Sequence, residues 1–238
     1  MSTERELEEE LDLLRREAEG AAQFLYQYLA IHDIGRSPKV HRALNRNPLF
    51  WNTSLGTLQT AVFIAIGRIF DQGSPHNVDP LLRLAQKNVG LFSRARLAMR
   101  KQGSATSPPS WLSEYVRDAY VPNGDDFRRL RKHVKKQRNV YEANYRDIRS
   151  KFFAHREVVD PSHLFSKTNV RELQRLVVFM IRLHDALWNL LHNGRRPTLR
   201  SARHSLRRMR DVPSPAGREG GVQERMIYEV ERVMKEIA

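Results

Sequence analysis

Arg149 and His155 are the pair of residues in this chain best suited to chemistry on a phosphodiester without a metal. They lie in the stretch RDIRSKFFAHRE, residues 146–157, on either side of an apolar step. Histidine can transfer protons near neutral pH. Arginine can bind a phosphate through two N–H groups and stabilise charge that develops on it. Cleavage of an RNA strand by its own 2′-hydroxyl needs those two roles.

The spacing of this pair is not specific in so basic a chain. An arginine precedes a histidine, with four to six residues between them, at four places. The other three are Arg36 with His41, Arg128 with His133, and Arg156 with His163. Position favours Arg149 and His155, because His155 follows Ile148 by seven residues and continues the apolar spacing of the preceding segment.

On a straight α-helix, the side chains of Arg149 and His155 would point about 120° apart, since the helix has 3.6 residues per turn. One site could still use both in two ways. The helix could loosen around residues 152–154, or two protomers could assemble a site across a twofold axis.

The elements that must position these residues are helices, so we predict an all-α fold. Every convincing periodic segment has helical spacing, and none has sustained strand alternation. The expected starts are Thr3 with Glu6 as a capping box, Asn47-Pro48, Val78, Asp125 or Asp126, Asn169 with Glu172, and Val222. The expected ends are Gly73 with Pro75, Gln86, about His155, and Gly194 with Pro197.

Apolar stripes predict the buried face of each helix. In the fourth helix, apolar residues recur every seven positions and form a seam of Phe127, Val134, Tyr141 and Ile148. The stripe of the first helix is Leu7, Leu11, Leu14, Ala18, Ala21, Leu25 and Tyr28. The stripe of the last helix is Val222, Met226, Val230, Val233 and Ile237.

Composition narrows the function classes. Hydrophobic residues make up 40% of the 238 residues, enough for a core, and the net charge is +14, which favours a polyanionic partner. The chain has no cysteine, and its nine histidines show no metal-ligand spacing. The sequence also lacks a signal-peptide pattern and an uninterrupted apolar run of membrane-spanning length. We therefore expect a cytoplasmic protein with no cofactor and no membrane partner.

Basic residues concentrate in two places that could bind nucleic acid. The fourth helix carries Arg128, Arg129, Arg131, Lys132, Lys135, Lys136 and Arg138 on its expected outer faces. Residues 195–220 hold eight arginines, including Arg203, Arg207 and Arg208, and two acidic residues. This change in composition after residue 194 predicts a helical bundle over 1–194 and a basic arm with a C-terminal amphipathic helix over 195–238. A solvated helix face and a disordered tail would give the same charge pattern.

Two further polar residues have structural interpretations. His184, beside Asp185 on an apolar helix, is expected to be a hydrogen-bonded core histidine. Asp71 is expected to end its helix and to form a local ion pair with Arg68, three residues earlier.

The sequence also resembles a known family. The stretches FWNTSLGTLQTAVFIAIGRIFD and RDIRSKFFAHRE resemble the HEPN domain, specifically its AbiU2-like branch, which is tied to abortive phage infection. The resemblance covers roughly residues 5–193 and not 195–238. It implies an antiparallel helical bundle that dimerises and brings two R-x4–6-H motifs together at a cleft. It also implies metal-independent endoribonuclease activity, with an antitoxin or defence-system protein as a further partner.

Carried onto this chain, the resemblance makes Arg149 and His155 the catalytic residues. Supporting cations would be Arg146, Lys151 and Arg156, and Asn144 and Asp147 would orient the catalytic pair. Ser150 departs from the Asn, Asp or His that often follows the motif arginine. Arg156 and Glu157 replace the tyrosine of a nucleotidylated subgroup, so we do not expect that form of antitoxin control.

Two hypotheses follow. The first is an RNA-cleaving homodimer that acts in phage defence or as a toxin and leaves a 2′,3′-cyclic phosphate. The alternative is a non-catalytic helical module that binds nucleic acid or a partner protein. A membrane-surface protein is disfavoured, because the basic arm has too little apolar surface to anchor strongly.

Overall fold

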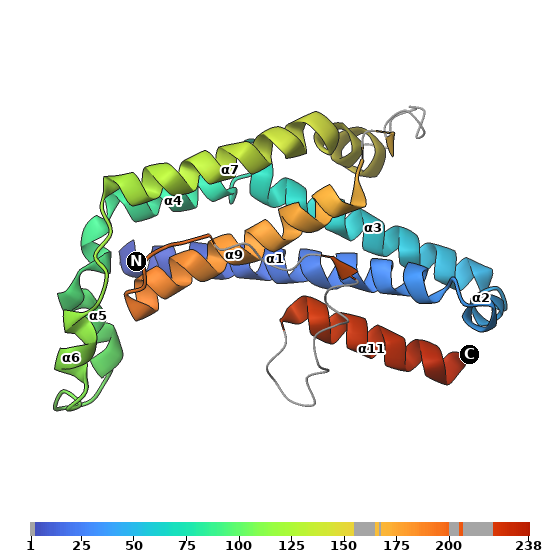
Figure 1. Cartoon of the computed structure of the whole chain (residues 1–238). Helices are drawn as coiled ribbons and strands as arrows, with labels where there is room; N and C mark the ends of the chain where they lie inside the picture. The colour runs from blue at the N-terminus through green and yellow to red at the C-terminus, as the bar shows by residue number, and fades with distance from the viewer. Residues whose placement is uncertain (1–2, 155–164, 167, 200–204, 207–220) are drawn as a thin grey trace.

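Helices make up the regular structure of the described part of the chain, which confirms the all-α prediction. The structure is a computed structural model that describes residues 3–154, 165–166, 168–199, 205–206 and 221–238. The helices are α1(Thr3–Ile34), α2(Pro38–Leu44), α3(Pro48–Phe70), α4(Val78–Lys87), η1(Val89–Phe92), α5(Arg94–Gln102), α6(Leu112–Arg117), α7(Gly124–Asn144), η2(Ile148–Ala154), α9(Val170–Asn193) and α11(Val222–Ile237). Figure 1 shows the long helices side by side as a bundle.

The long helix α1 lies at the centre of the bundle and contacts α3, α4, α9 and α11 (Figure 1). Its predicted stripe is buried from Leu7 to Leu25, whereas Tyr28 is half-buried. The small side chains of Ala18, Ala21 and Ala22 are fully covered and let neighbouring helices approach closely.

The helix α3 begins at Pro48 after Asn47, as predicted, and ends at Phe70, before the expected breakers. Within the described residues, α3 is the one helix long and apolar enough to cross a membrane, with 39% of that window buried. Core helices of soluble proteins have the same length and composition, and α3 packs along α1.

The basic helix α7 is capped by Asn123 and not by Asp125 or Asp126. The Asn123 side chain accepts hydrogen bonds from the backbone N–H groups of both aspartates, and the Asp126 side chain accepts from the Asn123 N–H, completing a capping box. The predicted seam of Phe127, Val134, Tyr141 and Ile148 is buried.

The prediction that this helix runs unbroken to His155 was wrong. The α-helix ends at Asn144, and residues 148–154 form the π-helical segment η2. Tyr145 at the break is fully buried, and its hydroxyl donates to the Asn169 carbonyl at 3.0 Å. The backbone at this point is therefore tied to the start of α9, and η2 continues with a wider turn.

The helix α9 follows its predicted boundaries. The Asn169 side chain accepts from the backbone N–H groups of Arg171 and Glu172, and Gly194 ends the helix with a φ of 58°. A β-carbon at residue 194 would lie 2.7 Å from the Ala119 β-carbon and 2.8 Å from a Leu97 methyl, so glycine also permits close packing there.

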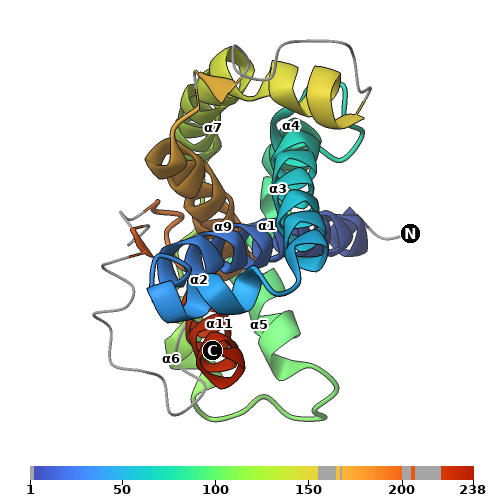
Figure 2. The same ribbon diagram turned by 90° about the vertical axis from the view of Figure 1, so that its right-hand side faces the viewer.

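The last helix, α11, packs against α1 on the side opposite α7 (Figure 2). Its buried face differs from the predicted one: Ile227, Val230 and Met234 are buried, whereas Val233 and Ile237 are exposed. The sequence offers two overlapping apolar stripes that share Val230, and packing on α1 selects one of them.

Candidate functional site

Aromatic packing positions the π-helical segment η2 against α3. Phe153 lies with its ring centroid 5.0 Å from that of Phe63 on α3. Phe152 meets Phe165 edge-on at 5.4 Å. These contacts fix the turn that carries Arg149, and they explain why the chain continues against α3 after the break at Tyr145.

The guanidinium of Arg149 forms an ion pair with Asp71 at the end of α3. Arg149 Nη1 donates to Asp71 Oδ2 at 3.2 Å, with the Arg149 side chain 26% exposed and the Asp71 side chain 17% exposed. Asp71 is the C-terminal cap of α3, as predicted, and its side chain also accepts from the Gly73 N–H. The predicted Asp71–Arg68 pair was wrong, because Arg68 instead pairs with Glu17 of α1 at 2.9 Å.

The side chain of Arg149 crosses α3 directly over Gly67. A β-carbon at residue 67 would lie 2.9 Å from Arg149 Nε and 3.2 Å from its Cγ and Cδ. Gly67 precedes Asp71 by four residues, so both lie on the same face of α3. The aliphatic part of Arg149 therefore occupies space that another residue type at position 67 would fill.

A second arginine binds the same end of α3. Arg138 Nε donates to the Phe70 carbonyl at 3.0 Å, and Arg138 Nη2 lies 2.8 Å from Asp79 Oδ2 of α4. Cations are favourable at the carbonyl end of a helix, where orphan acceptors and the helix dipole attract them. Arg138 is only 7% exposed. The expectation that it belongs to an exposed nucleic-acid-binding face was therefore wrong.

The buried hydroxyl of Tyr141 lies in the same region. Its ring stacks on Phe70 at 5.9 Å, and burial raises the pKa of the hydroxyl to about 12, with the charge of Asp71 adding to the shift. The hydroxyl therefore stays protonated near neutral pH. Within the described residues, neither this hydroxyl nor the buried Arg149 Nε has a hydrogen-bond partner.

None of the predicted supporting residues that the structure describes forms a hydrogen bond or ion pair with Arg149. Asn144 donates to Glu172 of α9 at 2.8 Å, and Lys151 pairs with Asp147 at 3.0 Å. Arg146 is exposed. Their roles as supporting cations and orienters stay predictions. His155 and Arg156 lie outside the described residues.

Six of the seven basic residues predicted to bind nucleic acid through α7 remain candidates once Arg138 is excluded. Arg128 and Arg129 pair with Asp125 and Asp126 in the first turn. In the part of the chain that the structure describes, no ion pair involves the other four, which are Arg131, Lys132, Lys135 and Lys136. Arg203, Arg207 and Arg208 lie outside the described residues. Nucleic-acid contact by either group stays a prediction.

Reversing three charges on α7 is expected to weaken RNA binding. With Lys132, Lys135 and Lys136 all changed to glutamate, the dependence of log affinity on log salt should become less steep by about 2, because each lost phosphate contact removes about 0.7 for a single strand. Fluorescence anisotropy with labelled single-stranded RNA at several salt concentrations measures this slope.

The matched control reverses Lys39, Arg42 and Arg46, which are exposed on or beside α2 and change the net charge equally. Equal loss of affinity in the two triple variants would show that net charge matters and the α7 face does not.

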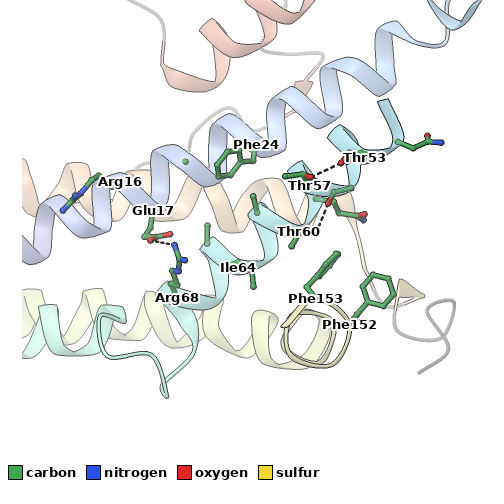
Figure 3. Close-up of a pocket in the computed structure, with 16 residues that line it drawn as sticks. Arg16, Glu17, Phe24, Thr53, Thr57, Thr60, Ile64, Arg68, Phe152 and Phe153 are labelled. Atoms are coloured by element: carbon green, nitrogen blue, oxygen red, sulfur yellow. Dashed lines mark hydrogen bonds and ion pairs between the residues drawn. The ribbon is translucent and has the colours of Figure 1, made fainter. Parts of the chain in front are cut away.

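An open groove of about 1090 Å³ lies between α1, α3 and η2 (Figure 3). Phe24, Thr57 and Thr60 line it together with Phe152 and Phe153, and the Glu17–Arg68 pair lies at one end. Arg149 is not among its lining residues. The groove and the arginine site therefore use different faces of η2.

Other candidate chemistry finds little support in the described part of the chain. His184 has a side chain only 12% exposed, with Nδ1 3.4 Å from Asp185 Oδ1, as expected for a histidine in the core. No group of three histidine, aspartate or glutamate side chains that could hold a metal ion occurs among the described residues.

The all-helical fold is consistent with a HEPN-type bundle, and the comparison with family models agrees. The AbiU2 model of the HEPN group matches residues 4–209, most of the chain. The chain therefore belongs to the HEPN AbiU2 family. The match extends past residue 193, where the resemblance was expected to end, into the basic arm, and it stops before α11. No curated protein and no solved structure matches the chain.

Two residues that lie beside Arg149 were not predicted as part of the site. They are Gly67, and Asp71, which was expected to pair with Arg68 and not with Arg149. The stretch GRIFD held a signal for both. The aspartate four residues after Gly67 lies on the same face of the helix, and a glycine inside a helix is one signal of close approach by another group, although Gly56 of the same helix has no such neighbour.

Proposed function

We propose that this chain is a metal-independent endoribonuclease of the HEPN type that acts in phage defence or as a toxin. Membership of the AbiU2 family supports the class. One observation carries the proposal further: the Arg149 side chain is held in one place by Gly67 and Asp71, six residues before His155 in the chain. A fixed, partly exposed guanidinium is what phosphate binding at a cleavage site requires.

In the proposed reaction, the RNA 2′-oxygen attacks the adjacent phosphorus and the 5′-oxygen leaves. Imidazole of His155 removes the 2′-hydroxyl proton or delivers a proton to the leaving 5′-oxygen. Arg149 binds the non-bridging oxygens and stabilises the charge that accumulates on them. The products are a 2′,3′-cyclic phosphate and a 5′-hydroxyl.

We further propose a homodimer that brings two Arg149–His155 motifs to one cleft. A second copy would supply both an acid and a base, because one histidine cannot hold both protonation states at once. An antitoxin or another defence protein would control the activity, and the cytoplasm would be its location.

The test is digestion of varied RNAs by the purified protein in excess EDTA, with analysis of the new termini. We expect cleavage that EDTA does not inhibit and fragments with 2′,3′-cyclic phosphate ends. No cleavage of any RNA, or fragments with a 3′-hydroxyl, would reject the proposed reaction.

One observation favours the alternative, a non-catalytic module that binds nucleic acid or a protein. The Arg149–Asp71 ion pair also ties η2 to α3, as a purely structural arginine would. On this alternative, RNA binding would be salt-sensitive and would not change when His155 is replaced by alanine, and no cleavage would occur.

A further inference from the structure

Gly67 lies inside a helix, where glycine lowers the stability of the fold relative to alanine. It lies three residues before the end of α3, is buried, and is part of a regular helix. Glycine inside a helix is less stable than alanine, because the unfolded chain has more freedom to lose. The group that fills the space beside it is the Arg149 side chain, which approaches the β-carbon position through three of its atoms.

The contacts at Gly67 and Asp71 hold different parts of Arg149. Gly67 lies beside Nε, Cγ and Cδ, whereas Asp71 accepts from Nη1. The Nε atom is buried, the Arg149 side chain as a whole is 26% exposed, and Nη2 makes no hydrogen bond or ion pair with a protein group in the described part of the chain. One edge of the guanidinium is thus fixed by protein, and Nη2 is left to meet a ligand from solvent.

We propose that Gly67 and Asp71 are the positioning residues of Arg149, which orient its guanidinium for the scissile phosphate of RNA. This inference rests on the proposed function. Gly67 admits the side chain across α3, and Asp71 holds one N–H edge so that the other faces the phosphate. Neither residue touches RNA, and both act through Arg149.

The charge of Asp71 separates this role from phosphate binding. A carboxylate beside Arg149 weakens attraction for the RNA phosphate, because it offsets the positive charge. Removing the carboxylate should therefore leave KM unchanged or lower it. If Asp71 positions Arg149 for the transition state, the same change lowers kcat. An effect on kcat without a rise in KM is not expected from a residue that only attracts RNA.

The first experiment compares two glycines of the same helix. Gly67→Ala improves helix propensity but displaces Arg149, whereas Gly56→Ala improves propensity in a place where no atom lies within 4 Å of the new β-carbon. We expect kcat to fall at least tenfold for Gly67→Ala and to stay within twofold of wild type for Gly56→Ala. The two melting temperatures should stay near that of the wild type.

The second experiment replaces Asp71, in case Gly67→Ala disturbs folding. Asp71→Ala should lower kcat at least tenfold, whereas Asp71→Asn, which keeps an oxygen that can accept from Nη1, should recover most of the rate. In an Arg149→Ala background, Asp71→Ala should cause no further loss. Wild-type kcat in both Asp71→Ala and Gly67→Ala, with cleavage intact in the wild type, would overturn the inference.

A spectroscopic readout tests the geometry apart from catalysis. The Arg149 Nε–H signal in a ¹H–¹⁵N spectrum, identified by its absence in Arg149→Ala, should be resolved in the wild type and lost in Asp71→Ala. An unchanged signal would overturn the positioning role. An intact, Asp71-dependent signal in a protein that cleaves no RNA would instead reject the proposed function and leave the pair structural.

Discussion

Replacing His155 with alanine is expected to lower the rate of RNA cleavage by about 10²- to 10⁴-fold, the usual contribution of a general acid or base. The alanine variant can neither accept the 2′-hydroxyl proton nor protonate the leaving oxygen. Arg149→Ala is expected to cost about 10²- to 10³-fold, because it removes stabilisation of the charge on the phosphate. Initial rates on a fluorogenic RNA measure both losses.

The double variant should cleave no more slowly than the slower single variant, since residues that act as one unit are not additive. The matched control is His133→Ala. His133 follows Arg128 with the same type of spacing and is exposed on α7, so its loss should leave the rate unchanged. Equal rates for His155→Ala and the wild type would remove His155 from the mechanism. Equal losses for His133→Ala and His155→Ala would remove the distinction between the two pairs.

Replacing Arg138 with alanine is expected to lower the free energy of unfolding by about 3 kcal/mol, near the lower end of the range for breaking a buried ion pair. The change leaves the Phe70 carbonyl without its donor and Asp79 without its counter-charge. The Asp79 side chain is 27% exposed, so water offsets part of the loss. Urea denaturation followed by circular dichroism gives this free energy.

The control for Arg138 is Lys135→Ala, on the same helix but exposed. Its effect on unfolding should be within about 0.5 kcal/mol, as for most surface substitutions. RNA affinity gives the complementary result, with Arg138→Ala close to wild type at temperatures where the variant is folded. A stable Arg138→Ala protein that binds RNA weakly would return Arg138 to the exposed binding face.

Local patterns in the sequence were enough to predict the helical class and much of the core. The seven-residue spacing that runs from α7 into η2 predicted that Phe127, Val134, Tyr141 and Ile148 are buried, because it places them on one face. Asn169 and Gly194 marked the ends of α9 through capping preferences that act within a few residues. The family was recognised from two stretches that lie far apart in the sequence.

Contacts between distant elements could not be predicted in the same way. Arg138 has the same residue type as its exposed neighbours, and only the approach of α3 and α4 buries it. Asp71 was expected to pair with Arg68 because the two are close in the sequence, whereas its partner Arg149 lies 78 residues later. The break at Tyr145 depends on a hydrogen bond to Asn169, twenty-four residues later. The side of α11 that is buried depends on α1.

The end of α3 has a consequence for comparing related chains. Arg138 donates a hydrogen bond to the backbone carbonyl of residue 70, so this bond does not depend on which side chain stands at that position. Arg149 pairs with the carboxylate of residue 71 and occupies the space left by the missing side chain at residue 67, so its position depends on the amino acids at both places. A related chain with a bulky residue at position 67, or with no hydrogen-bond acceptor at position 71, would have the same helical fold but a less well-defined position of the motif arginine. Among chains with the same R-x4–6-H motif, these two positions would then distinguish members that cleave RNA from members that do not.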